Sequence, residues 1–126
     1  MTTEDKREVV LRLLPSMGEI NTNGHIFGGW ILAQMDIAGG IIAGRAARGP
    51  VATVAIESMK FMSPMLVGDI VTVYAREERR GRTSMAIRVD VVASRGIEQQ
   101  QIDLTSGLFT FVALDETHRP RVLPER

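Results

Sequence analysis

Cysteine is absent from the sequence, and histidine occurs only twice, at His25 and His118. Without cysteine the protein has no disulfide framework, no thiol nucleophile and no thiolate metal ligand. Two histidines are also too few for a multi-histidine metal centre. The sequence therefore predicts no metal site, and it excludes catalysis by a cysteine thiol.

An excess of charge of either sign is also missing, because fifteen Lys and Arg residues balance fifteen Asp and Glu residues. This balance gives no general electrostatic attraction to nucleic acid or to an anionic membrane, so neither is an expected partner. The polar start of the chain leads into an apolar patch that is too short for a signal peptide or a membrane span. We therefore expect a cytoplasmic protein in which any basic patch is local.

Linkers, internal repeats and low-complexity runs do not occur either. A chain of 126 residues is long enough to bury one core and too short to build two. We therefore expect residues 1–126 to form a single domain.

What the sequence does contain is one long apolar segment with helical features. It begins at Gly28 and Gly29, continues to about residue 48, and is stopped by Gly49 and Pro50. Strand-forming residues dominate five other segments, which we predict as strands: residues 8–14, 51–62, 70–76, 83–93 and 102–114. The charged residues 77–82 and the polar residues 94–101 are predicted to form hairpin tips.

Four of these strands follow the helix with short connections, which is typical of an antiparallel sheet. Such a sheet has one face to bury, and the helix is the only element apolar enough to cover it. We therefore expect the large side chains on the broad side of the helix in the core: Trp30, Ile31, Met35, Ile37, Ile41 and Ile42. The predicted fold class is α+β, with a five-stranded antiparallel sheet wrapped around one long central helix.

Asp36 is the most informative residue of that helix. At 100° per residue it shares a narrow side with four small residues, Gly29, Ala33, Gly40 and Ala43. A buried carboxylate costs several kcal/mol unless hydrogen bonds or a counter-charge offset the cost. Asp36 is therefore either a structural acceptor for a neighbouring element, or a general base or nucleophile at a site that the small residues leave open.

Four segments occur in an order and spacing that resemble the YciA-type acyl-CoA thioesterases of the hotdog-fold superfamily. They are residues 23–30 with 34–36, residues 51–61, residues 67–69 and residues 81–84. The first reads Asn-Gly-His-Ile-Phe-Gly-Gly-Trp and the last reads Gly-Arg-Thr-Ser. The element order predicted above is also that of a hotdog domain.

The resemblance implies an enzyme that hydrolyses acyl-CoA to free fatty acid and coenzyme A, without a metal or another cofactor. Asp36 falls on the family's catalytic aspartate, which acts as general base or nucleophile, and Gly28 or Gly29 would offer backbone N–H groups to the thioester carbonyl. Family members usually carry Asn or Asp at the position of His25. The role of His25 is therefore open between catalysis, substrate contact and packing.

The resemblance also implies an assembly, with the active site at a homodimer interface and often three dimers in a hexamer. An independent physical reason supports association. A single curved sheet leaves an edge strand with unpaired backbone groups, and pairing with a second copy removes that edge. We therefore expect a homodimer at minimum.

Three residues near one predicted hairpin, Arg82, Thr83 and Ser84, are assigned by the resemblance to coenzyme A binding. Cationic and hydroxyl groups suit phosphates, although a charge run by itself indicates only a solvated surface. Lys60 is a weaker candidate for the same role.

Two smaller predictions complete the site. Asn23 and Gly24 are expected to form a structural turn before the helix. The methionines are expected to pack in the core, with three of them also able to line an acyl pocket: Met35, Met59 and Met62.

Two alternatives to a thioesterase remain at this stage. The first is a non-catalytic acyl-CoA-binding hotdog protein, in which His25 replaces a required catalytic group. The second is a hotdog acyl-thioester dehydratase, in which a histidine and a carboxylate would transfer protons across a double bond. Release of free coenzyme A distinguishes the thioesterase from both.

Overall fold

The computed structural model describes residues 7–16, 18, 20, 24–26 and 28–126. Within these residues the chain forms one long helix and five strands. In chain order they are β1 (Glu8–Leu13), α1 (Gly28–Ala47), β2 (Val51–Phe61), β3 (Ile70–Arg80), β4 (Ser84–Arg95) and β5 (Gln100–Ala113).

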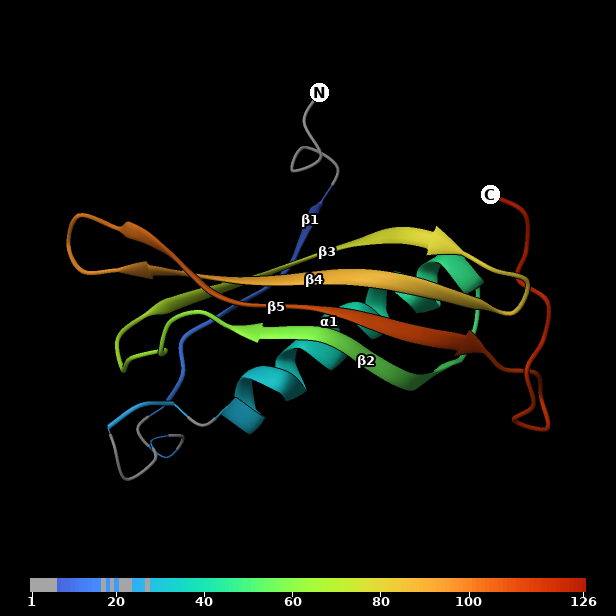
Figure 1. Ribbon diagram of the computed structural model, residues 1–126, viewed down its shortest axis with the longest axis horizontal. Coiled ribbons are helices and arrows are strands. Elements are labelled where there is room, and N and C mark those ends of the chain that lie inside the picture. Colours follow the sequence, from blue (N-terminus) through green and yellow to red (C-terminus); the bar gives the residue numbers. More distant parts are fainter. Residues whose placement is uncertain (1–6, 17, 19, 21–23, 27) are drawn as a thin grey trace.

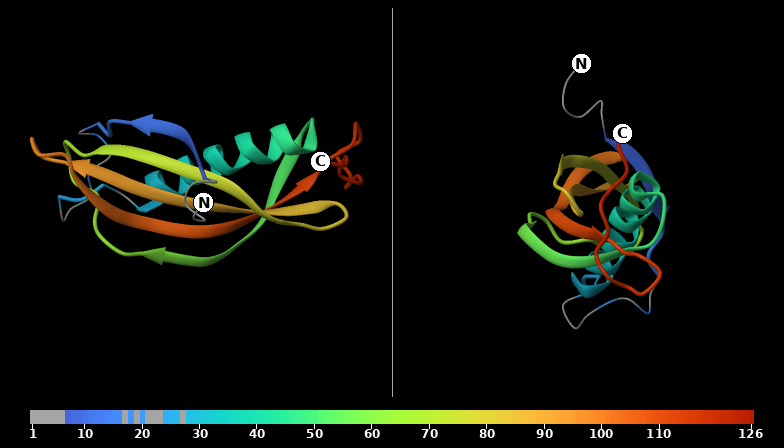
Figure 2. Two further views of the ribbon diagram at one scale, coloured as in Figure 1. Left: turned by 90° about the horizontal axis from the view of Figure 1, so that it is seen from above. Right: turned by 90° about the vertical axis from the view of Figure 1, so that its right-hand side faces the viewer.

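All five strands belong to one antiparallel sheet with the order β1-β3-β4-β5-β2. α1 runs along one face of this sheet, and the strands curve around it (Figures 1 and 2). β2 directly follows α1 in the chain and forms one edge of the sheet, while β1 forms the other edge. The predicted α+β class, with one helix and a five-stranded antiparallel sheet, is confirmed.

The core lies between α1 and the inner face of the sheet. α1 contributes Ile31 and Met35, and β5 contributes Phe109 and Phe111, all of them buried. Gly39 is required for close contact, because a Cβ atom at this position would lie 3.0 Å from the Phe111 ring. The helix and the sheet therefore pack closely at the middle of α1.

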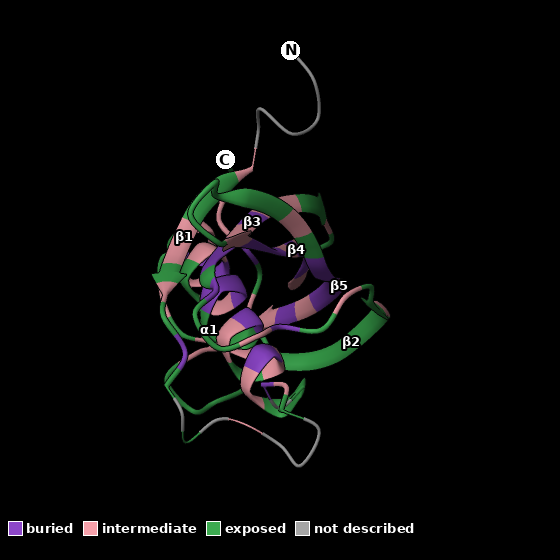
Figure 3. Cartoon of the chain, turned by 90° about the vertical axis from the view of Figure 1, so that its left-hand side faces the viewer, coloured by how far each residue is buried: buried purple, intermediate pink, exposed green. Residues whose placement is uncertain are grey.

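The prediction that the whole broad side of the helix is buried is wrong for two residues. Ile37 is 50% exposed and Ile41 is 42% exposed in the single chain. The sheet curves around only one side of α1, and none of the described strands covers the opposite side. β2 is exposed along most of its length as well, which Figure 3 shows in green.

The charged segment 77–82 was predicted as a hairpin tip, but β3 continues through it to Arg80. Arg79 and Arg80 pair with Ala86 and Met85 of β4, which leaves only residues 81–83 for the turn. Ion pairs make the charged strand end possible, since Arg80 lies 2.8 Å from Glu77. Charged residues that pair with one another can therefore extend a strand beyond the end that apolar periodicity predicts.

The remaining bounds differ little from the prediction. β4 reaches Arg95 and β5 begins at Gln100, so the second hairpin tip is shorter than predicted. Along β4, Arg88 and Asp90 are partly exposed between buried apolar neighbours. In the part of the chain that is described, no helix is long and apolar enough to span a membrane.

Candidate active site

Asp36 and Thr53 form a short hydrogen bond between α1 and β2. The Thr53 hydroxyl Oγ1 donates to Asp36 Oδ1 at 2.5 Å. This length is typical of a hydroxyl that donates to an ionised carboxylate, one of the stronger classes of hydrogen bond in proteins. Thr53 therefore holds one oxygen of the Asp36 carboxylate, Oδ1, in place.

A β-bulge in β2 explains why Thr53 reaches Asp36. Thr53 lies opposite the buried Phe111, and Ile56 lies opposite the buried Phe109, with the register shift between Thr53 and Ala55. Residues opposite each other on antiparallel strands share a face. The extra residue thus turns both Thr53 and Ile56 toward α1, whereas a regular strand would place them on opposite faces.

A pocket of about 300 Å³ lies beside this hydrogen bond. α1 and β2 supply its walls, which consist of Gly29, Leu32, Ala33, Asp36, Thr53 and Ile56. The predicted track of small residues therefore divides into two parts. Gly29 and Ala33 line the pocket, whereas Ala43 is fully buried, and a Cβ atom on Gly40 would lie 3.7 Å from Phe111.

The expectation that Asp36 is buried is not met in the single chain. Its side of α1 is the one that the sheet leaves uncovered, and the residue is exposed there. The desolvation cost expected for a buried carboxylate therefore does not arise in an isolated protomer. The carboxylate instead lies at an open surface between α1 and β2.

His25 and Gly28 line a second pocket, of about 260 Å³, at the N-terminal end of α1. Its other walls come from α1, from the end of β2 and from the segment after it: Ile26, Ile31, Phe61, Met62, Ser63, Pro64 and Met65. His25 forms a β-bridge with Leu66, and the Ile26 N–H donates to the Met65 carbonyl at 3.0 Å. The loop that precedes the helix is thus fastened to segment 64–69.

Asp69 and Arg95 hold segment 64–69 in turn. Asp69, only 1% exposed, accepts hydrogen bonds from the Leu66 N–H at 2.9 Å and from two nitrogens of Arg95. Burial acts to raise the pKa of Asp69, but the hydrogen bonds from Arg95 and Leu66 and the positive charge of Arg95 outweigh it, so its pKa is lowered. The hydrogen bond with Asp69 also raises the pKa of Arg95.

The predicted turn before the helix is described only in part. Gly24 has a φ of 78°, in the left-handed region that glycine adopts without steric cost, so a turn role fits this residue. Asn23 lies outside the described residues.

Of the four residues predicted to bind coenzyme A, Arg82, Thr83 and Ser84 follow one another at the β3–β4 turn, whereas Lys60 lies on β2. Ser84 lines a pocket of about 180 Å³ with Arg79, Arg80 and Gly81. The backbone carbonyls of Arg82 and Thr83 accept hydrogen bonds from the Leu123 and Ala113 N–H groups.

Lys60 lies opposite Ser106 on β5. By strand alternation it therefore belongs to the sheet face away from α1 and from Asp36. The methionines proposed for an acyl pocket are dispersed as well. Met35 is buried in the core, Met62 lines the pocket of His25, and neither reaches the pocket of Asp36.

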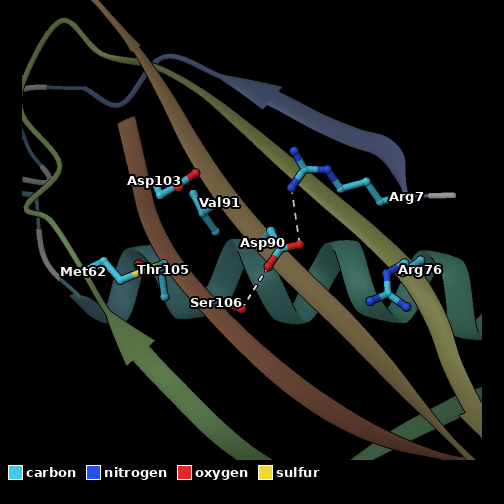
Figure 4. Close-up of a pocket in the computed structure, with 8 residues that line it drawn as sticks. All are labelled: Arg7, Met62, Arg76, Asp90, Val91, Asp103, Thr105 and Ser106. Carbon is cyan, nitrogen blue, oxygen red and sulfur yellow. Dashed lines mark hydrogen bonds and ion pairs between the residues drawn. The ribbon is translucent and has the colours of Figure 1, made fainter. Parts of the chain in front are cut away.

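A further polar pocket, of about 290 Å³, lies on the sheet face opposite α1 (Figure 4). Asp90 is at its centre, where it accepts a hydrogen bond from Ser106 at 2.9 Å and pairs with Arg7 at 3.4 Å. The Arg7 guanidinium also lies 4.0 Å from the centroid of the Tyr74 ring. These charges satisfy one another, so the network ties the start of β1 to β3, β4 and β5.

Among the described residues, no group of three or more His, Asp or Glu side chains is arranged to hold a metal ion. Thr53 is the functional candidate that the sequence prediction missed. In the sequence, Thr53 is only a threonine in an apolar strand. Strand periodicity does not single it out, because the β-bulge that turns its side chain toward α1 cannot be seen in the sequence.

Comparisons with known proteins place the chain in a family. The Thioesterase superfamily model matches residues 23–99. The acyl-CoA thioester hydrolase YciA of Salmonella typhimurium is 47% identical over 131 aligned positions, which cover 98% of each chain.

Two crystal structures are also similar over most of their length. One is a hexameric thioesterase from Yersinia pestis, with 42% identity, a TM-score of 0.90 and coverage of 94% of this chain and 97% of that one. The other is a hexameric hotdog fold thioesterase of Campylobacter jejuni, with 32% identity, a TM-score of 0.87 and coverage of 93% and 90%. The protein has the hotdog fold and belongs to the thioesterase superfamily.

Proposed function

We propose that this protein is an acyl-CoA thioesterase that hydrolyses acyl-CoA to a free fatty acid and coenzyme A in the cytoplasm. The observation that carries the proposal is Asp36, held by Thr53 at 2.5 Å beside a pocket with apolar walls. A carboxylate in this setting suits attack on an acyl group. Membership of the thioesterase superfamily and the activity named for the YciA relative support the same reaction.

In the general-base route, Asp36 takes a proton from water while the water oxygen forms a bond to the thioester carbonyl carbon. The C–S bond then breaks, coenzyme A leaves as a thiolate, and the thiolate takes up the proton. In the nucleophile route, Asp36 itself bonds to the carbonyl carbon and expels the thiolate, and water then hydrolyses the mixed anhydride. In both routes Thr53 holds one carboxylate oxygen and leaves the other to react.

The negative charge that develops on the carbonyl oxygen requires hydrogen-bond donors. The first N–H groups of a helix have no partner within the helix, so Gly28 and Gly29 are suited to this task. Gly29 and Asp36 are seven residues apart on α1, which places them about 10 Å apart along the helix axis. One thioester cannot reach both, so the donors for Asp36 must come from a second copy of the chain.

The surfaces that a second copy would cover are the ones left open around Asp36. Ile37 and Ile41 on α1 are exposed, as are Val54 and Ile56 on the edge strand β2. Pairing of two β2 edges would satisfy their backbone groups and bury these side chains. We propose such a dimer as the catalytic unit, with His25 and Gly28 of one copy facing Asp36 of the other.

We propose three such dimers in a hexamer, since the Yersinia pestis and Campylobacter jejuni thioesterases are hexameric. Arg82, Thr83 and Ser84, at the β3–β4 turn, are the proposed contacts for coenzyme A phosphates, because Arg82 is exposed and Ser84 lines a pocket together with Arg79 and Arg80.

Replacing Asp36 by Asn tests the proposal, because Asn keeps the shape and the hydrogen bond from Thr53 but cannot take a proton. We expect thiol release from acyl-CoA to fall by about 100- to 10,000-fold. Asp90→Asn is the matched control, since Asp90 lies on the opposite face of the sheet. Near-normal turnover in the Asp36 variant would refute the mechanism.

The wild-type protein distinguishes the alternative functions. Stoichiometric binding of acyl-CoA without release of coenzyme A would favour a binding protein. Loss of conjugation from an enoyl-CoA without thiol release would favour a dehydratase.

A further inference from the structure

Arg48 and Gly49, at the junction between α1 and β2, have different structural roles. The Arg48 N–H donates to the Arg45 carbonyl at 3.3 Å, and the Gly49 N–H donates to the Gly44 carbonyl at 3.2 Å. These are the two hydrogen bonds of a Schellman motif. The left-handed position of that motif belongs to Arg48, with a φ of 56°, and not to the glycine that the sequence suggested.

Gly49 is needed for a different reason. It is not among the described glycines with a left-handed φ, so its backbone conformation is open to other residues. A Cβ atom at this position would instead lie 2.8 Å from Nη2 of Arg121. The missing side chain therefore makes room for a guanidinium group from the C-terminal segment.

The Arg121 guanidinium joins the ends of two elements. Nη2 donates to the Ala47 carbonyl, at the end of α1, at 2.7 Å, and Nε donates to the Leu114 carbonyl, just after β5, at 2.8 Å. The Leu114 N–H in turn donates to the Pro50 carbonyl, just before β2, at 3.0 Å. A cation at the C-terminal end of a helix also interacts favourably with the helix dipole.

This junction lies close to the catalytic pair along the chain. Thr53 lies three positions after Pro50 in the chain, about 10 Å of extended strand. The hydrogen bond between Thr53 and Asp36 joins α1 to β2, so its length depends on how these two elements are placed relative to each other. A shift of the start of β2 would be transmitted directly to the Thr53 hydroxyl.

We propose that Arg121 is a positioning residue for the active site, acting through the α1–β2 junction on the hydrogen bond between Thr53 and Asp36. The inference rests on the proposed thioesterase function for its effect on turnover. Its physical content, the placement of Thr53 against Asp36, can be measured independently of turnover.

Gly49→Ala is the sharpest test, because the added methyl group displaces the guanidinium without straining the backbone. We expect kcat for acyl-CoA hydrolysis to fall by about 10-fold, within the range that a small misplacement of reacting groups causes. KM should change by less than about twofold, since substrate contacts are untouched. Gly44→Ala is the matched control, because its Cβ would meet the Gly49 carbonyl at an ordinary 3.7 Å.

Variants of Arg121 complete the activity test. Arg121→Ala should reproduce the loss of kcat, Arg121→Lys should restore part of it, and Gly49→Ala should add nothing to Arg121→Ala, because the clash has been removed. Melting temperatures identify variants that lose activity only because they unfold. Additive losses, or a folded Gly49→Ala protein with wild-type kcat, would overturn the proposal.

A second measurement does not depend on catalysis. The coupling free energy between Thr53 and Asp36 follows from urea unfolding of Thr53→Val, Asp36→Ala and the double variant, because each substitution removes one partner of the hydrogen bond. We expect this coupling to shrink when the same cycle is repeated in the Gly49→Ala background. An unchanged coupling would overturn the positioning role, whereas a wild-type protein without hydrolysis but with the expected loss of coupling would refute only the thioesterase function.

Discussion

Arg95 donates two hydrogen bonds to the Asp69 carboxylate, at 2.8 Å from Nε and 2.7 Å from Nη2, across 26 positions of the sequence. A third bond from Arg95, to the Pro64 carbonyl at 3.0 Å, completes a clamp on segment 64–69. This segment binds the loop of His25 through Met65 and Leu66. The pair therefore stabilises one wall of the pocket that contains His25 and Gly28.

Because of this pair, the free energy of unfolding should depend on pH in the acid range. The pKa of Asp69 is lowered in the folded state, so its contribution is complete above the ordinary carboxyl value of 3.8 and is lost as pH falls through the lowered value. Urea unfolding from about pH 7 to about pH 3 should show this loss, and Asp69→Asn should flatten the acid end of the profile. An equal loss of stability at low pH in the wild-type protein and in Asp69→Asn would contradict this role of Asp69.

At neutral pH, Asp69→Asn should lower the free energy of unfolding by about 2–3 kcal/mol, because charged hydrogen bonds of a buried group are lost. Glu8→Gln is the control. Glu8 pairs with Arg45 at 2.9 Å, but both side chains are more than half exposed, so the loss should stay below about 1 kcal/mol.

Thr53→Val should separate positioning from binding. The methyl group replaces the hydroxyl at nearly equal volume, so Asp36 loses its restraint while the pocket keeps its shape. We expect kcat to fall by about 10- to 100-fold with little change in KM. Thr53→Ser retains the hydroxyl and should recover most of the activity in the thiol-release assay, and equal losses in the two variants would argue against the hydrogen bond.

Two neighbouring glycines on α1 should respond in opposite ways to the same substitution. Gly39→Ala adds a methyl group 3.0 Å from the buried Phe111 ring, and overpacking of this kind costs about 1–3 kcal/mol of stability. Gly40→Ala meets the same ring at an ordinary 3.7 Å. It should raise stability by about 0.5–1 kcal/mol, because alanine loses less backbone entropy than glycine in a helix. Urea unfolding of both variants checks the contrast.

Val54→Lys should break the proposed dimer. Val54 is 57% exposed in the single chain and lies on the edge strand β2. Two lysines brought near each other by pairing of the β2 edges would repel each other. Sedimentation should show smaller species, and thiol release should fall with them. Ile97→Lys, at the exposed tip between β4 and β5, is the control and should leave the assembly intact.

The sequence by itself determined the fold class, because the long helix is the only element apolar enough to cover the buried face of an antiparallel sheet. It also indicated Asp36, since a lone carboxylate in an apolar helix requires a reason. The chain resembles a known family in four ordered motifs, and the comparisons confirmed that family. These features are local or follow from periodicity, so they can be read from residue types alone.

Tertiary structure decided the rest. The bulge that turns Thr53 toward Asp36 depends on the register between β2 and β5, which apolar alternation does not specify. Whether Ile37 is covered depends on how far the sheet curves around α1. The reason for Gly49 lies in Arg121, 72 positions later in the sequence. Contacts between distant segments arise only when packing brings those segments together, so no local pattern in the chain encodes them.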